Sequence, residues 1–295
     1  MSNKYVVITI WFKCNSSCEF CLLWDLHNSN HKLSLLDFAK IVKKISEEGI
    51  YDSIILSWWE ITLEPDLFKY LEIINKIWGF KNIRIQTNGQ LLSNIDLCNK
   101  LIEYGVNEYF ISINWSCSNL NDVITNSHWS FDKTMRWFLN LDSLWAHIIS
   151  NTVITTSNLN DLLDIFKMLS LIESIKEINL WNYMTKWDWT DLHLIVDYNN
   201  LKNVLVDIFR LNNKLNFPKK ITFFNIPDCV LISSWYIGWG AKQPDLISFW
   251  DINNKVFDNC YECSNKDVCS RRGSCIWIQK DYISKYWYNF NLLLD

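Results

Sequence analysis

Glycine and proline are both scarce in this chain of 295 residues, which contains 7 glycines and 4 prolines. Average usage places glycine at about 7% of residues, so a chain of this length would be expected to carry roughly three times as many. Tryptophan, by contrast, occurs 17 times. Because tight turns usually need small residues, the shortage raises the question of what forms the turns of this chain.

A basic excess and long apolar runs are also missing. The formal net charge is -4, and lysine and arginine are scattered, so nucleic acid is not the expected partner. No segment reaches the roughly 18 uninterrupted apolar residues of a membrane span, and the N-terminus lacks a basic region followed by a long apolar one. We therefore expect a soluble, cytoplasmic protein without a nucleic-acid or membrane partner.

Cysteine is plentiful, with 10 residues. Because a reducing compartment keeps thiols free, a disulfide framework is not expected, and metal binding becomes the leading explanation.

The hydrophobic content of 49% is enough to bury a full core, and the chain length suits an α/β barrel with an appendage.

Strand and helix patterns alternate over the first 190 residues. The expected strands are 5–10, 53–57, 82–87, 108–113, 147–154 and 177–181, and the expected helices are 35–48, 65–78, 93–104, 131–144 and 158–170. Such a series indicates a parallel sheet covered by helices, although periodicity does not decide whether the sheet closes. Beyond it we expect a helix at 198–213 and a strand at 220–224.

Polar motifs lie at or after the carboxyl ends of the first five expected strands. They are KCNSSCEFC, WWE, TNG, SINWS and SNT, in chain order. In α/β barrels and open α/β sheets this edge carries the active site, so the motifs are expected to meet at one mouth.

Cys14, Cys18 and Cys21 form the pattern C-x3-C-x2-C directly after the first strand. Three thiolates at this spacing can hold a cubane iron-sulfur cluster and leave one iron without a protein ligand. A zinc knot that lacks its fourth ligand and three unrelated buried thiols are the alternatives. Structural zinc sites usually show paired C-x2-C elements, so an iron-sulfur cluster is favoured.

The motif CNSSCEFC resembles that of the radical SAM superfamily, and the resemblance extends over about residues 5–290. It implies a partial (β/α)6 TIM-like barrel. It also implies a [4Fe-4S] cluster held by Cys14, Cys18 and Cys21, with S-adenosylmethionine on the fourth iron. Reductive cleavage would then give a 5′-deoxyadenosyl radical that abstracts hydrogen from the substrate.

The same resemblance implies the cofactor contacts. Phe20 would lie beside the adenine, and the WWEI segment (Trp58, Trp59, Glu60, Ile61) corresponds to the family's GGE followed by proline. That backbone meets the methionine amino group in the family. Further polar contacts would come from the strand-end residues Thr87, Asn88, Ser112, Asn114 and Asn151.

Two indoles are unexpected where a backbone approaches a ligand, because each can bury about 150–250 Å². Other tryptophans also occupy positions at which similar proteins have glycine or which adjoin turns, namely Trp115, Trp129, Trp137, Trp145 and Trp287. We hypothesise that many are UGA codons of a source that reads UGA as glycine. A naturally tryptophan-rich core is the alternative, although a core does not explain indoles at turns.

A second cysteine group lies near the C-terminus. Cys260, Cys263 and Cys269 form C-x2-C-x5-C, followed by Cys275 and preceded by Cys229. This spacing resembles the SPASM and twitch modules of radical SAM enzymes, which hold auxiliary [4Fe-4S] clusters. One auxiliary cluster bound by four of the five cysteines is expected, and a zinc S4 site is the competing interpretation.

The expected organisation is therefore a radical SAM core at 1–190, further barrel or linking elements at 191–225 and a small Cys-rich iron-sulfur module at 226–295. The resemblance implies a peptide or small cofactor-precursor substrate and an electron donor such as flavodoxin or ferredoxin. Two rival interpretations are a non-catalytic iron-sulfur protein whose SAM site is blocked by Trp58 and Trp59, and a zinc-organised binding module.

Overall fold

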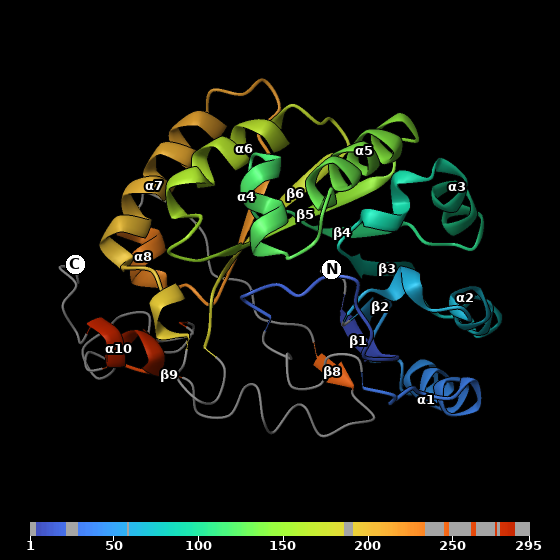
Figure 1. The fold of residues 1–295 in the computed structure, drawn as a ribbon. Helices are drawn as coiled ribbons and strands as arrows, with labels where there is room; N and C mark the ends of the chain where they lie inside the picture. The colour runs from blue at the N-terminus through green and yellow to red at the C-terminus, as the bar shows by residue number, and fades with distance from the viewer. Residues whose placement is uncertain are drawn as a thin grey trace.

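A computed structural model of the chain shows a curved parallel sheet with helices around its outer side (Figure 1). The structure describes residues 4–21, 29–57, 59–185, 191–233, 245–247, 261–263, 275 and 278–286. The strands of the sheet are β1 (Tyr5–Thr9), β2 (Ser53–Ser57), β3 (Asn82–Thr87), β4 (Glu108–Ser112), β5 (His147–Ile154), β6 (Ile175–Asn182), β7 (Lys220–Phe224) and β8 (Asp245–Ile247).

The sheet order is β7-β6-β5-β4-β3-β2-β1-β8, and every neighbouring pair is parallel. Strands β1 to β7 therefore follow one another in chain order, as right-handed βα units do. The predicted α/β fold, a partial TIM-like barrel, is confirmed as an open, curled half-barrel.

The helices that connect the strands are amphipathic and bury one apolar face each. They are α1 (Leu35–Glu48), α2 (Leu67–Lys76), α3 (Ile95–Glu103), α5 (Ser130–Ser143), α6 (Leu162–Ser170) and α7 (Tyr198–Asn212). Helix α1 is typical: the Ser34 hydroxyl accepts from the Asp37 backbone N–H, and Gly49 ends the helix at φ 62°. The cap at Ser34 and the stop at Gly49 are both local sequence signals for the ends of a helix.

Helix α2 is shorter than the expected 65–78 because the residues before it form a different structure. A 3-10 turn at Ile61–Leu63 follows the carboxyl end of β2, and α2 begins only at Leu67. The sequence analysis also missed α4 (Ser118–Ile124), whose 7 residues are too short for a helical period to show.

The C-terminal region contributes short elements. Helix α8 (Asp228–Ser233) follows β7, while β9 (Tyr261–Glu262) pairs antiparallel with β10 (Ile278–Gln279), which leads into α10 (Lys280–Tyr286). The Asp281 carboxylate accepts from the Thr185 backbone N–H at 2.8 Å, so α10 is tied to the end of β6. In the part of the chain that the structure describes, no helix combines the length and apolarity that a bilayer span requires.

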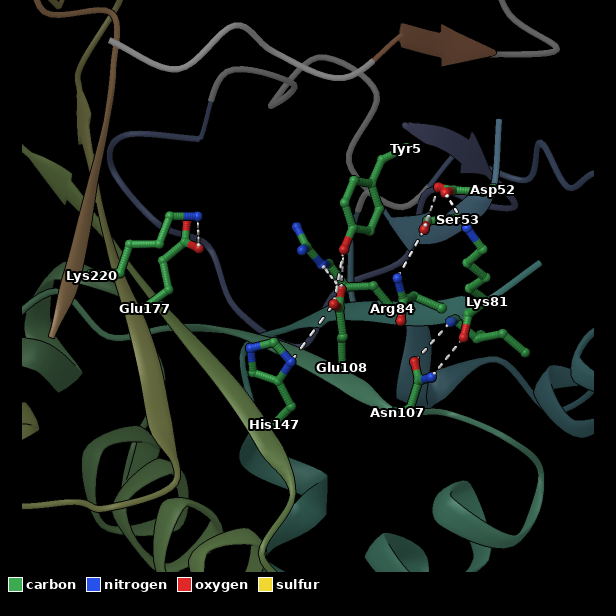
Figure 2. Close-up of polar contacts among 12 residues, drawn as sticks. Tyr5, Asp52, Ser53, Lys81, Arg84, Asn107, Glu108, His147, Glu177 and Lys220 are labelled. Carbon is green, nitrogen blue, oxygen red and sulfur yellow. Dashed lines mark hydrogen bonds and ion pairs between the residues drawn. The ribbon is translucent and has the colours of Figure 1, made fainter. Parts of the chain in front are cut away.

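A polar network lies at the amino-terminal end of the barrel, away from the strand ends that carry the motifs (Figure 2). The Glu108 carboxylate accepts hydrogen bonds from Tyr5 Oη at 2.8 Å and from Arg84 Nε at 2.8 Å, and His147 Nδ1 lies 3.7 Å away. The Arg84 guanidinium also stacks 4.3 Å from the centre of the Tyr5 ring. The network joins β1, β3, β4 and β5 through one buried carboxylate.

Replacing Arg84 with methionine should destabilise the protein by about 3 kcal/mol, because it removes the cation beside a buried carboxylate. The matched control is Lys81→Met, which breaks the exposed ion pair with Asp52 at 3.2 Å. That change should cost less than about 1 kcal/mol. Urea unfolding measures both free energies, and equal losses would contradict the role given to the buried network.

Candidate active site

A cavity of about 320 Å³ lies at the carboxyl ends of the strands. Its size falls within the range of small-molecule sites. The residues that line it include the three cysteines predicted for the N-terminal cluster and most of the predicted cofactor contacts: Cys14, Cys18, Phe20, Cys21, Trp59, Glu60, Thr87, Asn88, Ser112, Asn114 and Asn151. Trp58 lies outside the described residues. Parallel strands bring their carboxyl ends to one edge, and this is why residues so far apart in the chain meet here.

The cysteine loop follows β1, and none of its three cysteines forms a disulfide. Burial raises the pKa of Cys14 to about 12, and the charges of Glu60 and Cys21 add to the rise. Burial likewise raises the pKa of Cys18, with Cys21 and Cys14 as the next causes. The three sulfur atoms are thus close enough to repel one another as thiolates, and a cationic metal centre would relieve that repulsion.

Neighbouring turns hold the loop in place. Asn88 Nδ2 donates to Asn15 Oδ1 at 2.7 Å, and Gln90 Nε2 donates to Ser16 Oγ at 2.8 Å. On the other side, the Ser17 backbone N–H donates to the Thr125 carbonyl oxygen at 2.9 Å, immediately after α4. The TNG turn and α4 therefore fix the shape of the cysteine loop. Sequence reasoning did not assign Ser16, Gln90 or Thr125 to the site.

Glu60 is fully buried and joins the turn after β2 to the turn after β3. Its Oε1 accepts from the hydroxyl groups of Thr62 and Thr87, and its Oε2 accepts from the Asn88 backbone N–H at 2.7 Å. Burial raises the pKa of this carboxyl, whereas these hydrogen bonds lower it. The Glu60 backbone N–H donates to the Lys13 carbonyl oxygen at 3.0 Å, so the same residue also anchors the start of the cysteine loop.

Trp59 precedes this carboxylate and has a left-handed backbone, with φ 64°. Its indole lines the cavity and meets the Phe12 ring edge to face, with ring centres 6.0 Å apart. The predicted backbone contact with a cofactor therefore lies at a residue whose own side chain forms part of the cavity wall.

Several polar atoms at the strand ends face the cavity region. Asn114 Oδ1 accepts from the Val153 backbone N–H at 2.9 Å, which ties β4 to β5. By contrast, Asn151 Oδ1 and Asn121 Oδ1 are buried without a hydrogen-bond partner among the described residues. Because a buried acceptor without a partner is costly, these two oxygens favour a polar ligand in the cavity.

Three of the C-terminal cysteines are described, Cys229, Cys263 and Cys275. Burial raises the pKa of Cys229 to about 12, and the charges of Cys275 and Cys263 raise it further. These three residues from distant parts of the chain are therefore neighbours. Cys260 and Cys269 lie outside the described residues.

Within the described ranges, no group of three or more His, Cys, Asp or Glu side chains is arranged as a finished metal site. The fit to an iron-sulfur cluster therefore depends on the donor chemistry. Cys14, Cys18 and Cys21 are soft sulfur donors, line one cavity and repel one another when ionised. The residues present fit such a cluster on these grounds.

The fold and the cavity define an α/β half-barrel with a three-thiol loop at its mouth. The sequence profile of the radical SAM superfamily matches residues 8–169, more than half of the chain. The chain belongs to the radical SAM superfamily.

Two relatives that are named for an enzymatic activity match this chain over part of their length. The GTP 3′,8-cyclase of Aquifex aeolicus is 24% identical over 235 residues, which cover 76% of this chain and 67% of that protein. The probable GTP 3′,8-cyclase of Methanopyrus kandleri is 24% identical over 174 residues, which cover 59% of this chain and 55% of that protein. The chain thus matches only about half of the latter relative.

Two solved structures share the fold. SuiB of Streptococcus suis bound to S-adenosylmethionine superposes with a TM-score of 0.70 at 14% identity, covering 96% of this chain and 74% of that one. The protein anSMEcpe with bound AdoMet superposes with a TM-score of 0.61 at 17% identity, covering 74% of this chain and 63% of that one. At these identities the likeness shows the fold alone.

Replacing Glu60 with glutamine should remove a pH-dependent loss of stability. Burial raises the pKa of this carboxyl above its ordinary value of 4.5 in the folded protein. The folded state therefore keeps its proton to higher pH than the unfolded chain, and this group lowers stability as the pH rises above about 4.5. The variant should lose less stability than the parent between pH 5 and pH 8, as measured by urea unfolding.

The control is Asp66→Asn. Ion pairs with Lys69 and Lys32 lower the pKa of Asp66 to about 2, so its contribution is present above the ordinary pKa and is lost as the pH falls. The Asp66→Asn variant should therefore lose less stability than the parent as the pH falls below about 4, whereas Glu60→Gln should differ from the parent as the pH rises. Identical profiles for Glu60→Gln and the parent would contradict the assignment of a raised pKa to Glu60.

Proposed function

We propose that this chain cleaves S-adenosylmethionine reductively at a [4Fe-4S] cluster held by Cys14, Cys18 and Cys21. The product, a 5′-deoxyadenosyl radical, would then abstract hydrogen from a substrate held in the half-barrel. Membership of the superfamily supports this proposal, as does the convergence of the three thiols with the polar strand ends on one cavity.

The cluster and S-adenosylmethionine supply the one-electron chemistry when they are bound, and the protein supplies positioning and exclusion of water. Phe20 is assigned to the adenine and the backbone of residues 58–60 to the methionine amino group. Asn151 Oδ1, which is buried and has no partner among the described residues, can accept a hydrogen bond from the cofactor. The Glu60 carboxylate is already engaged by Thr62, Thr87 and Asn88, so it acts by positioning the turn.

The charge of the cavity supports a substrate without phosphate groups, such as a peptide segment. Among the described residues that line it there is no lysine or arginine, and Glu60 is the carboxylate present. A triphosphate is normally held by cationic side chains or helix N-termini, because each phosphate oxygen must be neutralised or hydrogen-bonded. SuiB, which shares the fold, has been crystallised with its precursor peptide SuiA.

GTP cyclisation is the second candidate. The match to the GTP 3′,8-cyclase of Aquifex aeolicus over 76% of this chain favours it. Cations from segments outside the described residues would be needed to bind the triphosphate. Stimulation of S-adenosylmethionine cleavage by GTP would distinguish this candidate from a peptide-modifying enzyme.

We further propose one auxiliary [4Fe-4S] cluster of the SPASM or twitch type in a module at 226–295. The proximity of Cys229, Cys263 and Cys275 supports it, with a fourth ligand from Cys260 or Cys269. Zinc at the same thiols is the competing interpretation. Electrons would come from a flavodoxin or ferredoxin.

Anaerobic reconstitution tests the cluster assignments. We expect about eight iron atoms per chain in the parent, and about four in a Cys14→Ala/Cys18→Ala/Cys21→Ala variant or in a Cys229→Ala/Cys263→Ala/Cys275→Ala variant. The control is Cys117→Ala, at an exposed cysteine that should leave the iron content unchanged. Zinc in place of iron at the C-terminal group would reject the auxiliary cluster.

The reaction itself is tested by 5′-deoxyadenosine formation with a strong reductant. Product that disappears in the Cys14→Ala/Cys18→Ala/Cys21→Ala variant supports the proposal. A fully assembled cluster without product, in the parent and in a Trp58→Gly/Trp59→Gly variant alike, would instead identify a non-catalytic iron-sulfur protein.

A further inference from the structure

Three tryptophans have the backbone conformation that glycine adopts most readily. The φ angles are 64° at Trp59, 62° at Trp129 and 54° at Trp145. Among the described residues, the other non-glycine residues with positive φ are Asn126 and Asn225. Asparagine tolerates this region, whereas a bulky residue there is an outlier because its Cβ crowds the following carbonyl oxygen.

The turn that ends α5 at Trp145 has the same geometry as the turn that ends α3 at Gly105. After α3, the Gly105 N–H donates to the Ile102 carbonyl oxygen and the next N–H donates to that of Leu101. After α5, the Trp145 N–H donates to the Asp142 carbonyl oxygen, and the next N–H donates to that of Leu141. The two turns have the same hydrogen bonds at the same spacing, and each leads into a strand. One βα unit therefore has tryptophan where its neighbour has glycine.

Burial of the indole does not explain the conformation at the two surface positions. Trp145 is 77% exposed and Trp129 is 62% exposed. Trp129 directly precedes α5, where its backbone N–H donates to Asp122 Oδ2 at 2.7 Å. The backbone at this position is therefore fixed by a main-chain contact, while the indole gains little from packing.

Trp59 is the position with a consequence for ligand binding. Its indole forms part of the cavity wall, one residue before the buried Glu60. A glycine there would adopt φ 64° without strain and would return the volume of the indole to the cavity.

We infer that the functional protein carries glycine at positions 59, 129 and 145, because its source decodes the corresponding UGA codons as glycine. The inference follows from backbone geometry, and it identifies individual positions among the 17 tryptophans of a chain with 7 glycines. Trp115 and Trp137 do not share the left-handed backbone, so this argument leaves them undecided. Only the part that concerns ligand space at position 59 rests on the proposed function.

Paired glycine and alanine variants test the backbone requirement. At 129 and 145 both substitutions remove the indole, but only glycine removes the Cβ that conflicts with positive φ. Each glycine variant should therefore melt about 2–4 °C higher than the matching alanine variant. Trp78 is the control, since it is 89% exposed and does not have positive φ. There alanine should be at least as stable as glycine, and the same order at 129 and 145 would overturn the inference.

Peptide mass spectrometry of the protein purified from its natural source tests the decoding directly. Glycine at 59, 129 and 145 is expected, and tryptophan at these positions would overturn the inference.

Binding of S-adenosylmethionine to the reconstituted Trp59→Gly variant, measured by equilibrium dialysis, should be at least tenfold tighter than to the parent, because the volume of the indole returns to the cavity. Equal binding would overturn the claim about ligand space. Absence of binding to both proteins would count against the proposed function, and the melting order and the peptide masses would still decide the glycine positions.

Discussion

The buried carboxylate of Glu60 is the interaction on which the mouth of the barrel depends. It accepts hydrogen bonds from the turns after β2 and β3, while its own backbone N–H holds the residue that precedes Cys14. Hydrogen bonds to a charged group contribute about 1.5–3 kcal/mol each and offset part of the cost of burying the charge, but burial still outweighs them and the pKa of Glu60 stays raised. The cysteine loop and the TNG turn are consequently positioned by one residue that the family resemblance had assigned to the cofactor.

The helix ends impose a second constraint. Each βα unit must reverse direction within a few residues, and α1, α3 and α5 end at residues 49, 105 and 145 with left-handed backbones. Glycine meets this requirement at the first two and tryptophan stands at the third. The shortage of glycine noted in the composition is thus a shortage at positions where the fold requires a particular backbone conformation.

Much of the scaffold was predictable because hydrophobic patterns and caps are local signals. The expected ranges of β2, β3, β5 and β7 match the structure, and so does the range of α1, with Ser34 and Gly49 at its ends. The start of α2 was wrong because the Glu60 side chain accepts from the Thr62 backbone N–H and caps a 3-10 turn in front of the helix. The same carboxylate is held by residues 27 and 28 positions away. The support of the cysteine loop by Gln90 and α4 was missed for the same reason. Such contacts exist only after the strands have assembled.

The cavity lining also limits how a ligand can be selected. Many of the residues that line it carry neutral hydroxyl or amide groups, although most of its surface is apolar. The Asn151 and Asn121 oxygens, which have no partner among the described residues, can accept hydrogen bonds without adding formal charge. Recognition by such a wall relies on shape and hydrogen-bond direction, so an indole in the wall changes both more than an added charge at the rim would. On the proposed function, position 59 acts on the site through the volume of its side chain, whereas Glu60 acts through the placement of the backbone. These two effects act on adjacent residues of one turn, so a substitution at 59 that leaves the Glu60 contacts intact is expected to alter cofactor binding without altering cluster assembly.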